Sequence, residues 1–471
     1  MHSYFLSTLF LAVPLTLCAA DATPREPLRL TLKRAVEIAT SPEGNTYIQL
    51  SEENLRQAKS RSAEARSAFL PDIEAQASQT SAMKSLAALG LDLATSQTLL
   101  GAENGLTGPL ATVEKGLLND IIDKIPRVVG PFSSVDVRAR VAQSVFDLSN
   151  IRRYQASKAA VRAAAQDGDN TNETVSATVA KAYLAALRAD ADVEAYQSNV
   201  ALAEAVLKQS ENQKNAGTGT GIEVTRAKVQ LSNEKQRLLA MQNERNKAYL
   251  QLLRVMGLNL ATSLELTDKL SYEPADGITV EQAEAEAVKN RPDVKAQADR
   301  EAAARLNANA VKFERLPNLV AYADYGSTGT NGNTVSLLPT REYGFAVRVP
   351  IFDGGRRDAR RAETASQFRQ ERVRTNDLHE QIELEIRTSL DSLHNAEEQL
   401  KVAEEGLTLS DSELTQARRR YAAGVASSLE VTDAQTRLER ARDNRIAALF
   451  GYNVARIDLG RAMGNVRRVV Q

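Results

Sequence analysis

Residues 341–361 read REYGFAVRVPIFDGGRRDARR, and this stretch joins two different patterns. In its first half, large apolar residues occupy every second position, which is typical of a β-strand with one apolar face: Tyr343, Phe345, Val347 and Val349. Pro350 ends this alternation, and a long charged stretch begins after Gly355. The sequence therefore predicts a two-faced strand that leads directly into a long helix.

Two very long helices are predicted. No proline follows residue 350, so residues 356–423 can form one unbroken helix of about 100 Å at 1.5 Å per residue. Along it, mostly apolar residues recur at alternating spacings of three and four: Leu393, Ala396, Leu400, Ala403, Leu407, Ser410, Leu414, Ala417 and Tyr421. Residues 148–216 show the same coiled-coil pattern. Both helices must therefore pack lengthwise against other helices.

An internal duplication organises the chain. The stretch from Glu223 to Gly257 aligns at a constant offset with the stretch from Glu430 to Gly464, and 12 of these 35 positions are identical. Shorter correspondences link the two halves elsewhere, such as Val-Phe-Asp at 145–147 with Ile-Phe-Asp at 351–353. We therefore predict a first structural repeat over residues 21–270 and a second over residues 271–471.

Each repeat is predicted to contain a helix, a β-hairpin, a very long helix, a tight turn and a shorter returning helix. The first repeat has a long hairpin loop at 83–131, its long helix at 148–216 and its returning helix at 221–257. The second has its first helix at 280–315, its hairpin at 318–352, its long helix at 356–423 and its returning helix at 428–464. The chain is therefore expected to be mainly α-helical, with four strands.

Composition narrows the classes of function. Charged residues make up 25% of the chain, the net charge is −1, and no basic patch stands out, so nucleic acid is not the expected partner. The three histidines show no metal-ligand spacing, and neither a nucleophile motif nor a phosphate loop is found. We therefore expect no enzyme activity, no cofactor and no bound metal.

The N-terminal residues predict export. Residues 1–20 combine an apolar core with a small-residue end that suits signal-peptidase cleavage before Asp21. Cys18 also allows a second interpretation as a lipidated cysteine, although Leu17 stands where a small residue is typical. If residues 1–20 are removed, the mature chain has no cysteine and hence no disulfide.

The strands limit how the chain can enter a membrane. Beyond the leader no apolar run approaches the roughly 18 residues that a transmembrane helix needs, so a membrane could be crossed only by strands. Four strands are too few, since single-chain bacterial barrels begin at about eight. Several copies would therefore have to share one barrel and one helical tube.

The chain resembles the TolC family of outer-membrane efflux ducts. The resemblance rests on the strand-to-helix junctions at 145–147 and 350–355, and on the turns Ala-Gly-Thr at 216–218 and Ala-Gly-Val at 423–425, each followed by Glu-Val-Thr. It implies a homotrimer with a twelve-stranded barrel in outer-membrane lipid and a twelve-helix periplasmic tube. It also implies two partners, a periplasmic adaptor protein and an inner-membrane pump.

The resemblance places functional residues at the turn end of the tube. It implies that Gly217, Thr218, Gly424 and Val425 form the tip that docks the adaptor, and that Glu223, Tyr421, Glu430 and Asp433 form the gate. The resemblance also implies an arginine that holds this gate closed, but its position is occupied by Ala426 in this chain. Arg226 or Arg418 to Arg420 could replace that arginine. Each residue also has a structural interpretation: glycines end helices, and acids favour helix N-termini.

The predicted function is the exit duct of a tripartite efflux or type I secretion system. The duct would be a passive, water-filled channel in the outer membrane, with a periplasmic extension. The alternative is a soluble periplasmic coiled-coil adaptor or scaffold, which would share the long helices but would lack the four membrane strands and the duplication. The sequence does not name the cargo.

Overall fold

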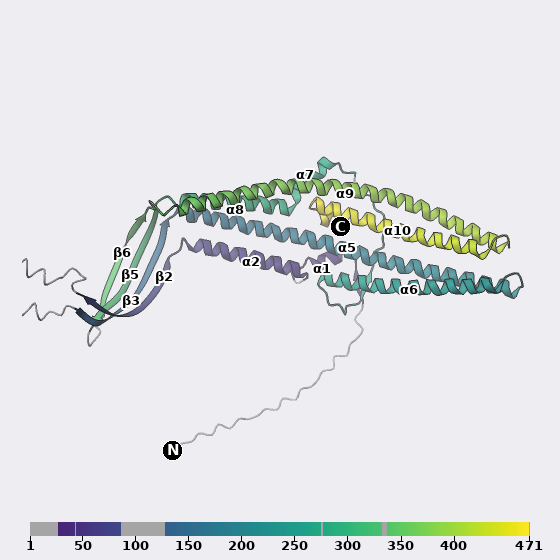
Figure 1. Cartoon of the computed structure of the whole chain (residues 1–471), viewed down its shortest axis with the longest axis horizontal. Helices are drawn as coiled ribbons and strands as arrows, with labels where there is room; N and C mark the ends of the chain where they lie inside the picture. The colour runs from purple at the N-terminus through teal and green to yellow at the C-terminus, as the bar shows by residue number, and fades with distance from the viewer. Residues whose placement is uncertain (1–26, 43, 86–127, 275–276, 332–336, 471) are drawn as a thin grey trace, which may run out of the picture. The chain divides into compact units, whose positions relative to one another are not determined.

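The computed structural model describes residues 27–42, 44–85, 128–274, 277–331 and 337–470. Its elements in chain order, most of them labelled in Figure 1, are β1 (Leu28–Leu30), α1 (Leu32–Ala39), α2 (Thr46–Ser67), β2 (Asp72–Ser85), β3 (Val128–Phe146), α5 (Leu148–Asn215), α6 (Gly221–Met256), β4 (Leu264–Leu266), α7 (Val280–Asn290), α8 (Pro292–Phe313), β5 (Asn318–Asn331), β6 (Leu338–Arg348), α9 (Arg356–Ala422), α10 (Ser428–Ala462) and α11 (Val466–Val470). The predicted signal peptide, Cys18 and residues 86–127 of the predicted loop lie outside these residues.

The chain divides into two compact units. We call the first the sheet unit, made of Glu53–Gln166 and Asp293–Leu378, and the second the hairpin unit, made of residues up to Glu52, Asp167–Pro292 and His379–Gln471. The long helices α5 and α9 contribute residues to both. Among the described helices, none is long and apolar enough to cross a membrane.

The sheet unit contains one antiparallel sheet in the order β2-β3-β5-β6. Its strand register places Glu74, Arg140, Asp324 and Glu342 in one row on one face. The next row, on the opposite face, holds Ile73, Val141, Ala323 and Tyr343. The period-two pattern of the sequence therefore produces one charged face and one apolar face, as expected for alternating side chains.

Both long helices begin with an aspartate that caps their first turn. The carboxylate of Asp147 accepts hydrogen bonds from the N–H groups of Ser149 and Asn150, at 2.8 and 3.2 Å. The carboxylate of Asp353 accepts one from the N–H group of Arg357, at 3.2 Å. This capping explains why the aspartate recurs at both junctions.

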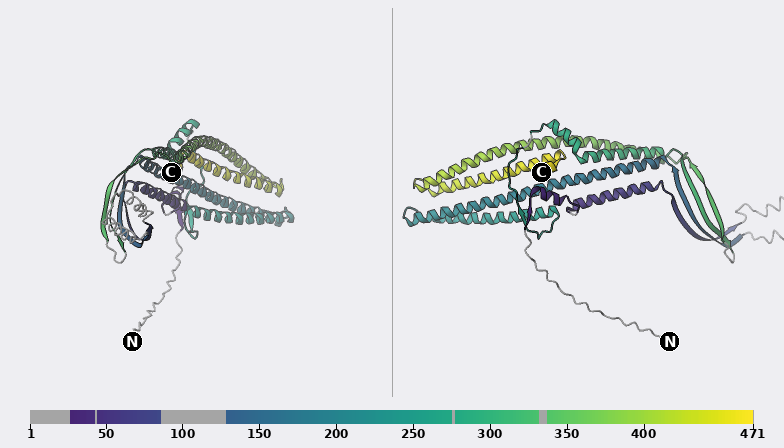
Figure 2. Two further views of the ribbon diagram at one scale, coloured as in Figure 1. Left: turned by 60° about the vertical axis from the view of Figure 1, so that its left-hand side comes forward. Right: turned by 180° about the vertical axis from the view of Figure 1, so that it is seen from behind.

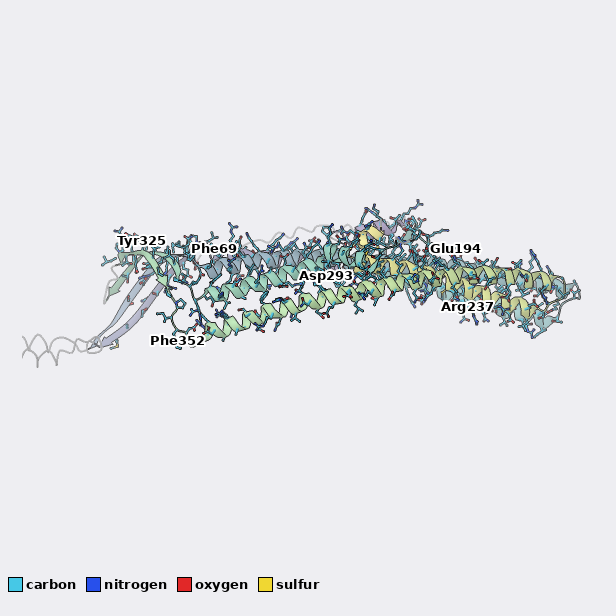
Figure 3. The ribbon with its side chains drawn as sticks, turned by 90° about the horizontal axis from the view of Figure 1, so that it is seen from above. Phe69, Glu194, Arg237, Asp293, Tyr325 and Phe352 are labelled. Carbon is cyan, nitrogen blue, oxygen red and sulfur yellow. The ribbon has the colours of Figure 1, made fainter. Side chains whose placement is uncertain are left out.

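The second junction differs from the prediction. The hairpin predicted over 318–352 ends earlier, since β6 stops at Arg348, just before Pro350, which has no N–H group to donate to a neighbouring strand. Phe352, labelled in Figure 3, is 88% exposed at this junction. Gly354 and Gly355 follow with φ of 68° and 85°, values that glycine adopts without steric cost.

The predicted helix over 280–315 is two helices, α7 and α8. The break falls at Arg291, whose φ and ψ of −59° and 123° are not helical, because the residue before a proline avoids the helical region. Pro292 then begins α8, where its missing N–H costs nothing. The side chain of Arg291 is buried and pairs with Glu385 at 2.7 Å, so the break is fixed by packing.

The C-terminal end also differs slightly. The returning helix predicted over 428–464 ends at Ala462, and a short further helix, α11, follows after Gly464. Gly464 has φ of 70°. A side chain there would meet the backbone of Arg291 at 2.8 Å, so both the conformation and the space call for glycine.

The core of the hairpin unit lies where segments far apart in sequence meet. β1 pairs in parallel with β4, and the buried Tyr183 of α5 donates hydrogen bonds to the carbonyl of Leu30 and to Asp268, both at 2.9 Å. Burial raises the pKa of Tyr183 well above its usual range, so its hydroxyl stays a donor. Figure 2 shows the two long-helix hairpins, α5 with α6 and α9 with α10, running out from this core.

Candidate gate and docking surface

Two turns close the helical hairpins of the hairpin unit and carry the predicted docking residues. In residues 216–220 and 423–427, a glycine takes the left-handed conformation, with φ of 76° at Gly217 and 74° at Gly424. The N–H groups of Thr218 and Val425 then donate back to the last turns of α5 and α9, at 3.0 and 3.1 Å. This is the Schellman type of helix end, so the turn geometry itself requires glycine.

The two turns are open to solvent. A Cβ atom added at Gly217 or Gly424 would meet nothing within 4 Å, and Val425 is 68% exposed. Both turns lie at the same end of the hairpin unit, at the right-hand side of Figure 1. The four predicted docking residues therefore form an exposed surface at the ends of two neighbouring hairpins.

Glu223 caps a helix. Its carboxylate accepts a hydrogen bond from the N–H group of Thr220 at 2.9 Å, as in a capping box. It also lines a narrow hollow with Arg226 of the same helix, and Ser428 and Thr432 of α10 form another wall. The structural interpretation of Glu223 therefore holds, while its position between α6 and α10 is also compatible with a gate.

Tyr421 lies in an apolar cluster that joins three helices. The cluster contains Val206 of α5, Leu414, Ala417 and Tyr421 of α9, and Val431, Ala434 and Leu438 of α10. Tyr421 is only 4% exposed. Its hydroxyl is buried and makes no hydrogen bond in the part of the chain that the structure describes. Packing, and not hydrogen bonding, fixes this side chain.

The two acids of α10 differ in their surroundings. Glu430 forms an ion pair with Arg420, with 3.0 Å between Oε1 and Nε, and both side chains are well exposed. Asp433 is exposed. The pair places one of the predicted replacement arginines beside a predicted gate acid, whereas Ala426 offers no charge.

The four predicted gate residues do not form one connected group. Within the described residues, no hydrogen bond or ion pair joins any two of them. Glu223 of α6 faces the gap between α6 and α10, and Tyr421 of α9 packs in the cluster that α9 shares with α5 and α10. Glu223 therefore lies at the contact of α6 with α10, whereas Tyr421 and Glu430 both lie at the contact of α9 with α10.

A second polar group was missed by the sequence analysis. Glu234 and Arg237 of α6 and Glu439 of α10 meet further along the hairpins, where Arg237 donates to both carboxylates at 3.1 Å. A signal was present: Glu234 continues the three-four seam of Val224, Ala227 and Leu231, so a charged residue occupies an apolar position. Its partner on α10 could not be identified from sequence alone.

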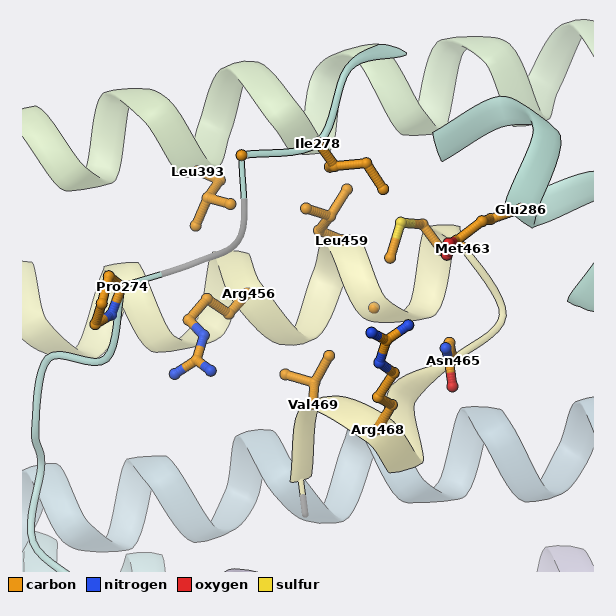
Figure 4. A pocket seen from close by; sticks show the side chains of 12 residues that line it. Pro274, Ile278, Glu286, Leu393, Arg456, Leu459, Met463, Asn465, Arg468 and Val469 are labelled. Carbon is orange, nitrogen blue, oxygen red and sulfur yellow. The ribbon is translucent and has the colours of Figure 1, made fainter. Parts of the chain in front are cut away.

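One larger cavity lies away from the turns. It has a volume of about 350 Å³ and combines apolar residues such as Leu393 and Met463 with the cationic residues Arg456 and Arg468 (Figure 4). Arg456 pairs with Glu273 at 3.1 Å. None of the predicted gate or docking residues lines this cavity.

Solved outer-membrane channels share this fold. The outer-membrane channel OprN matches 92% of this chain and 90% of its own length, with a TM-score of 0.74 and 18% identity. The CmeC outer-membrane channel of Campylobacter jejuni matches 98% of this chain and 94% of its own length, with a TM-score of 0.74 and 14% identity. The fold is thus that of outer-membrane channels.

Sequence comparison gives the family. Residues 129–258 and 285–465 match the outer membrane efflux protein family, and the chain belongs to this family. The family resemblance predicted from the sequence is confirmed, and with it the outer-membrane location.

Individual relatives are distant. The pyoverdine export outer membrane protein OpmQ of Pseudomonas putida is 25% identical over 304 residues, which are 63% of this chain and 63% of that protein, just under two thirds of its length. OpmQ of Pseudomonas aeruginosa is 24% identical over 80% of this chain and 76% of its own length. The alkaline protease secretion protein AprF of the same species is 20% identical over 66% of each.

Proposed function

We propose that this protein is the exit duct of a tripartite efflux or type I secretion system, a passive water-filled channel with a gate at its periplasmic tip. The observation that carries the proposal is the two-faced sheet. Its apolar face leaves Ile73, Tyr343 and Phe345 between 70% and 80% exposed, which suits lipid. Its opposite face carries the charged row described above, which suits water.

The sheet needs other copies of the chain. Among the strands that the structure describes, β2 and β6 each pair on one side only, and every unpaired backbone group would cost several kcal/mol in lipid. Three copies with four strands each would close a twelve-stranded barrel, and their long and returning helices would form a twelve-helix tube. The proposed assembly is therefore a homotrimer.

The polar face would line the channel. In addition to the charged row across all four strands, Arg138 forms an ion pair with Asp136 and a longer one, at 3.8 Å, with Asp324. Gly326 leaves room for Arg138, because a Cβ there would come within 2.5 Å of the arginine side chain. Charged residues that pair with one another on a strand face are tolerated beside water and would be costly beside lipid.

The gate would be formed where the hairpins end. Tyr421 holds α9 and α10 against α5 by packing, and the ion pair of Glu430 with Arg420 joins α9 to α10. In a trimer, Glu430 and Asp433 of three copies would bring six carboxylates to the narrow end of the tube. Glu223 would contribute at the neighbouring contact between α6 and α10.

The exposed turns would dock a periplasmic adaptor, which in turn would connect to an inner-membrane pump. Gly424→Pro should distort the turn without reaching the sheet, so we expect reduced capture of the adaptor with normal membrane insertion. A pull-down with the adaptor measures this. Unchanged capture would contradict docking at this turn.

The cargo would be selected by the pump. The names of the relatives mention pyoverdine export and protease secretion, so related ducts serve different cargoes. A wide duct with water-facing walls suits such passive use.

Fractionation and conductance together test the proposed function. We expect the protein in the outer membrane as an oligomer that requires detergent and dissociates on heating, and we expect ion conductance after insertion into planar bilayers. The alternative, a soluble periplasmic coiled-coil adaptor or scaffold, predicts recovery in the soluble fraction and no conductance. The exposed apolar face of the sheet favours the duct.

A further inference from the structure

Ion pairs within each helical hairpin are exposed. In the α5–α6 hairpin, Lys235 pairs with Glu204 at 3.1 Å, and both side chains are more than half exposed. In the α9–α10 hairpin, Arg437 pairs with Glu413 at 2.8 Å, with about half of each side chain exposed. Pairs of this kind contribute little to stability.

The polar contact between the two hairpins is different. Nη1 of Arg237 donates to Glu234 of its own helix and to Glu439 of α10, both at 3.1 Å, although these two glutamates are 99% and 92% buried. Arg237 itself, labelled in Figure 3, is half exposed. The contact therefore joins two hairpins through buried carboxylates. We call Glu234, Arg237 and Glu439 the inter-hairpin lock.

One carboxylate oxygen of the lock has no donor within the described residues, although Oε1 of Glu234 accepts a second hydrogen bond from the side-chain amide of Gln230 at 2.8 Å. Oε2 of Glu234 is buried and accepts no hydrogen bond within the described residues. Asp443 of α10 lies close by and accepts a hydrogen bond from Tyr196 of α5 at 3.2 Å. Two buried glutamates thus share one arginine, with a third carboxylate nearby, and a buried, unpaired carboxylate oxygen is costly unless a proton is present.

Other charged groups around the lock come from each neighbouring helix. α5 contributes Asp192 and Arg188, which lie 3.8 Å apart. α10 contributes Arg442, which donates to Asn199 of α5 at 2.8 Å and is therefore engaged elsewhere. α9 pairs with α10 through Glu404 and Arg445 at 3.7 Å, outside the lock. These groups do not neutralise the buried glutamates.

The ionisation of the lock follows from its burial. Burial, and then the charge of Glu234, raise the pKa of Glu439 to about 7. Burial also raises the pKa of Glu234 and of Asp443. Comparison of the two repeats supports a special role for Glu234. The equivalent position in the second repeat is Ala441, a buried small residue that is ordinary in a helix seam.

We propose that Glu234, Arg237 and Glu439 form a proton-dependent lock that keeps the two hairpins of each protomer together and the tip closed. This inference rests on the proposed duct function and adds its regulation. With one proton held by the two glutamates, the single charge of Arg237 balances the one negative charge that remains on them. When that proton leaves to water, the uncompensated carboxylates repel one another, the hairpins separate and the tip opens.

The direction with pH follows from linkage. If opening exposes Glu439 to water, its pKa falls from about 7 toward its ordinary value of 4.5. The closed state then binds the proton more tightly than the open state. The stabilisation of the closed state relative to the open state is therefore complete below pH 4.5 and is lost as the pH rises through 7. We expect the open fraction to rise at least about tenfold between pH 5 and pH 8, since one pKa unit corresponds to a factor of ten.

Planar-bilayer conductance of the purified oligomer at pH 5, 6, 7 and 8 tests the lock. Glu439→Gln imitates the protonated form and still accepts from Arg237, so its conductance should stay low across this range. Glu234→Gln should also reduce the rise of conductance between pH 5 and pH 8, compared with the wild type. The matched control is Glu413→Gln, which neutralises an exposed pair within one hairpin and should leave the wild-type profile unchanged.

The outcomes separate the lock from the duct. A wild-type protein that never conducts would contradict the proposed duct function. A conducting protein whose pH profile is the same in Glu439→Gln, Glu234→Gln and wild type would overturn the lock alone. Should Glu439→Gln fail to assemble, the profile of Glu234→Gln decides. The same flattening in the Glu413→Gln control would also overturn the lock, because it would show a general charge effect.

Discussion

Replacing Tyr421 tests whether packing closes the tip. The side chain is 4% exposed and belongs to the cluster that joins α5, α9 and α10. Removing a buried aromatic side chain typically costs about 3 to 5 kcal/mol. Its hydroxyl makes no hydrogen bond within the described residues, so Tyr421→Phe should be neutral or slightly stabilising. The two substitutions therefore separate the ring from the hydroxyl.

The packing free energy that Tyr421→Ala removes should increase the fraction of channels whose tip is open. The cluster includes Val206 of one hairpin and residues of the other, so separating the hairpins must disrupt it. If about half of the loss, roughly 2 kcal/mol, distinguishes the closed from the open state, the open fraction rises roughly thirtyfold, because 1.4 kcal/mol is a factor of ten. Glu223→Ala removes only half of a capping box, worth about 1 kcal/mol, and should open the tip less.

Single-channel conductance in planar bilayers measures this effect, with trimer yield as the control for folding. We expect Tyr421→Ala to raise the resting conductance strongly, Glu223→Ala to raise it weakly, and Tyr421→Phe to match the wild type. Equal opening by the alanine and phenylalanine variants would show that the hydroxyl matters, and the packing argument would be wrong.

Two further predictions concern charge and turn geometry. If Glu430 and Asp433 line the narrow end of the channel, their clustered negative charges should attract multivalent cations, which should then block the channel. The double substitution Glu430→Ala with Asp433→Ala should remove the block without changing trimer yield. A persisting block would place these side chains outside the pore. Gly257→Ala should lower the thermal midpoint, followed by circular dichroism, more than Gly217→Ala does. Both glycines have a left-handed backbone, but only a Cβ at Gly257 would meet a neighbouring atom, the carbonyl oxygen of Gly44 at 2.2 Å. We therefore expect Gly257→Ala to lower the free energy of unfolding by about 2 to 4 kcal/mol and Gly217→Ala to lower it by about 1 kcal/mol. Equal midpoints would contradict the steric argument.

Features with a sequence period could be predicted well. The alternation around Tyr343 and the three-four seam through Tyr421 each repeat over many residues, so strand faces and long helices followed directly. Helix ends were less certain. The break at Pro292 was missed because charged and alanine residues continue on both sides of it, and the strand predicted up to Phe352 ignored the missing donor at Pro350.

Side-chain partners far apart in sequence could not be predicted. Arg237 and Glu439 are separated by 202 positions, and no local pattern indicates that they meet. The parallel pairing of β1 with β4 is similar, since three-residue strands give almost no periodic signal. The family resemblance supplied the gate residues, but the structure showed which of them pack, which cap a helix and which form ion pairs.

The number of chains in the membrane-extracted protein tests the proposed duct most directly. Native mass spectrometry of the oligomer, released from the outer membrane in detergent, measures that number. We expect three copies, because three chains of four strands each would close the proposed twelve-stranded barrel and leave no open sheet edge. A stable single chain, or recovery of the protein in the soluble fraction, would contradict it.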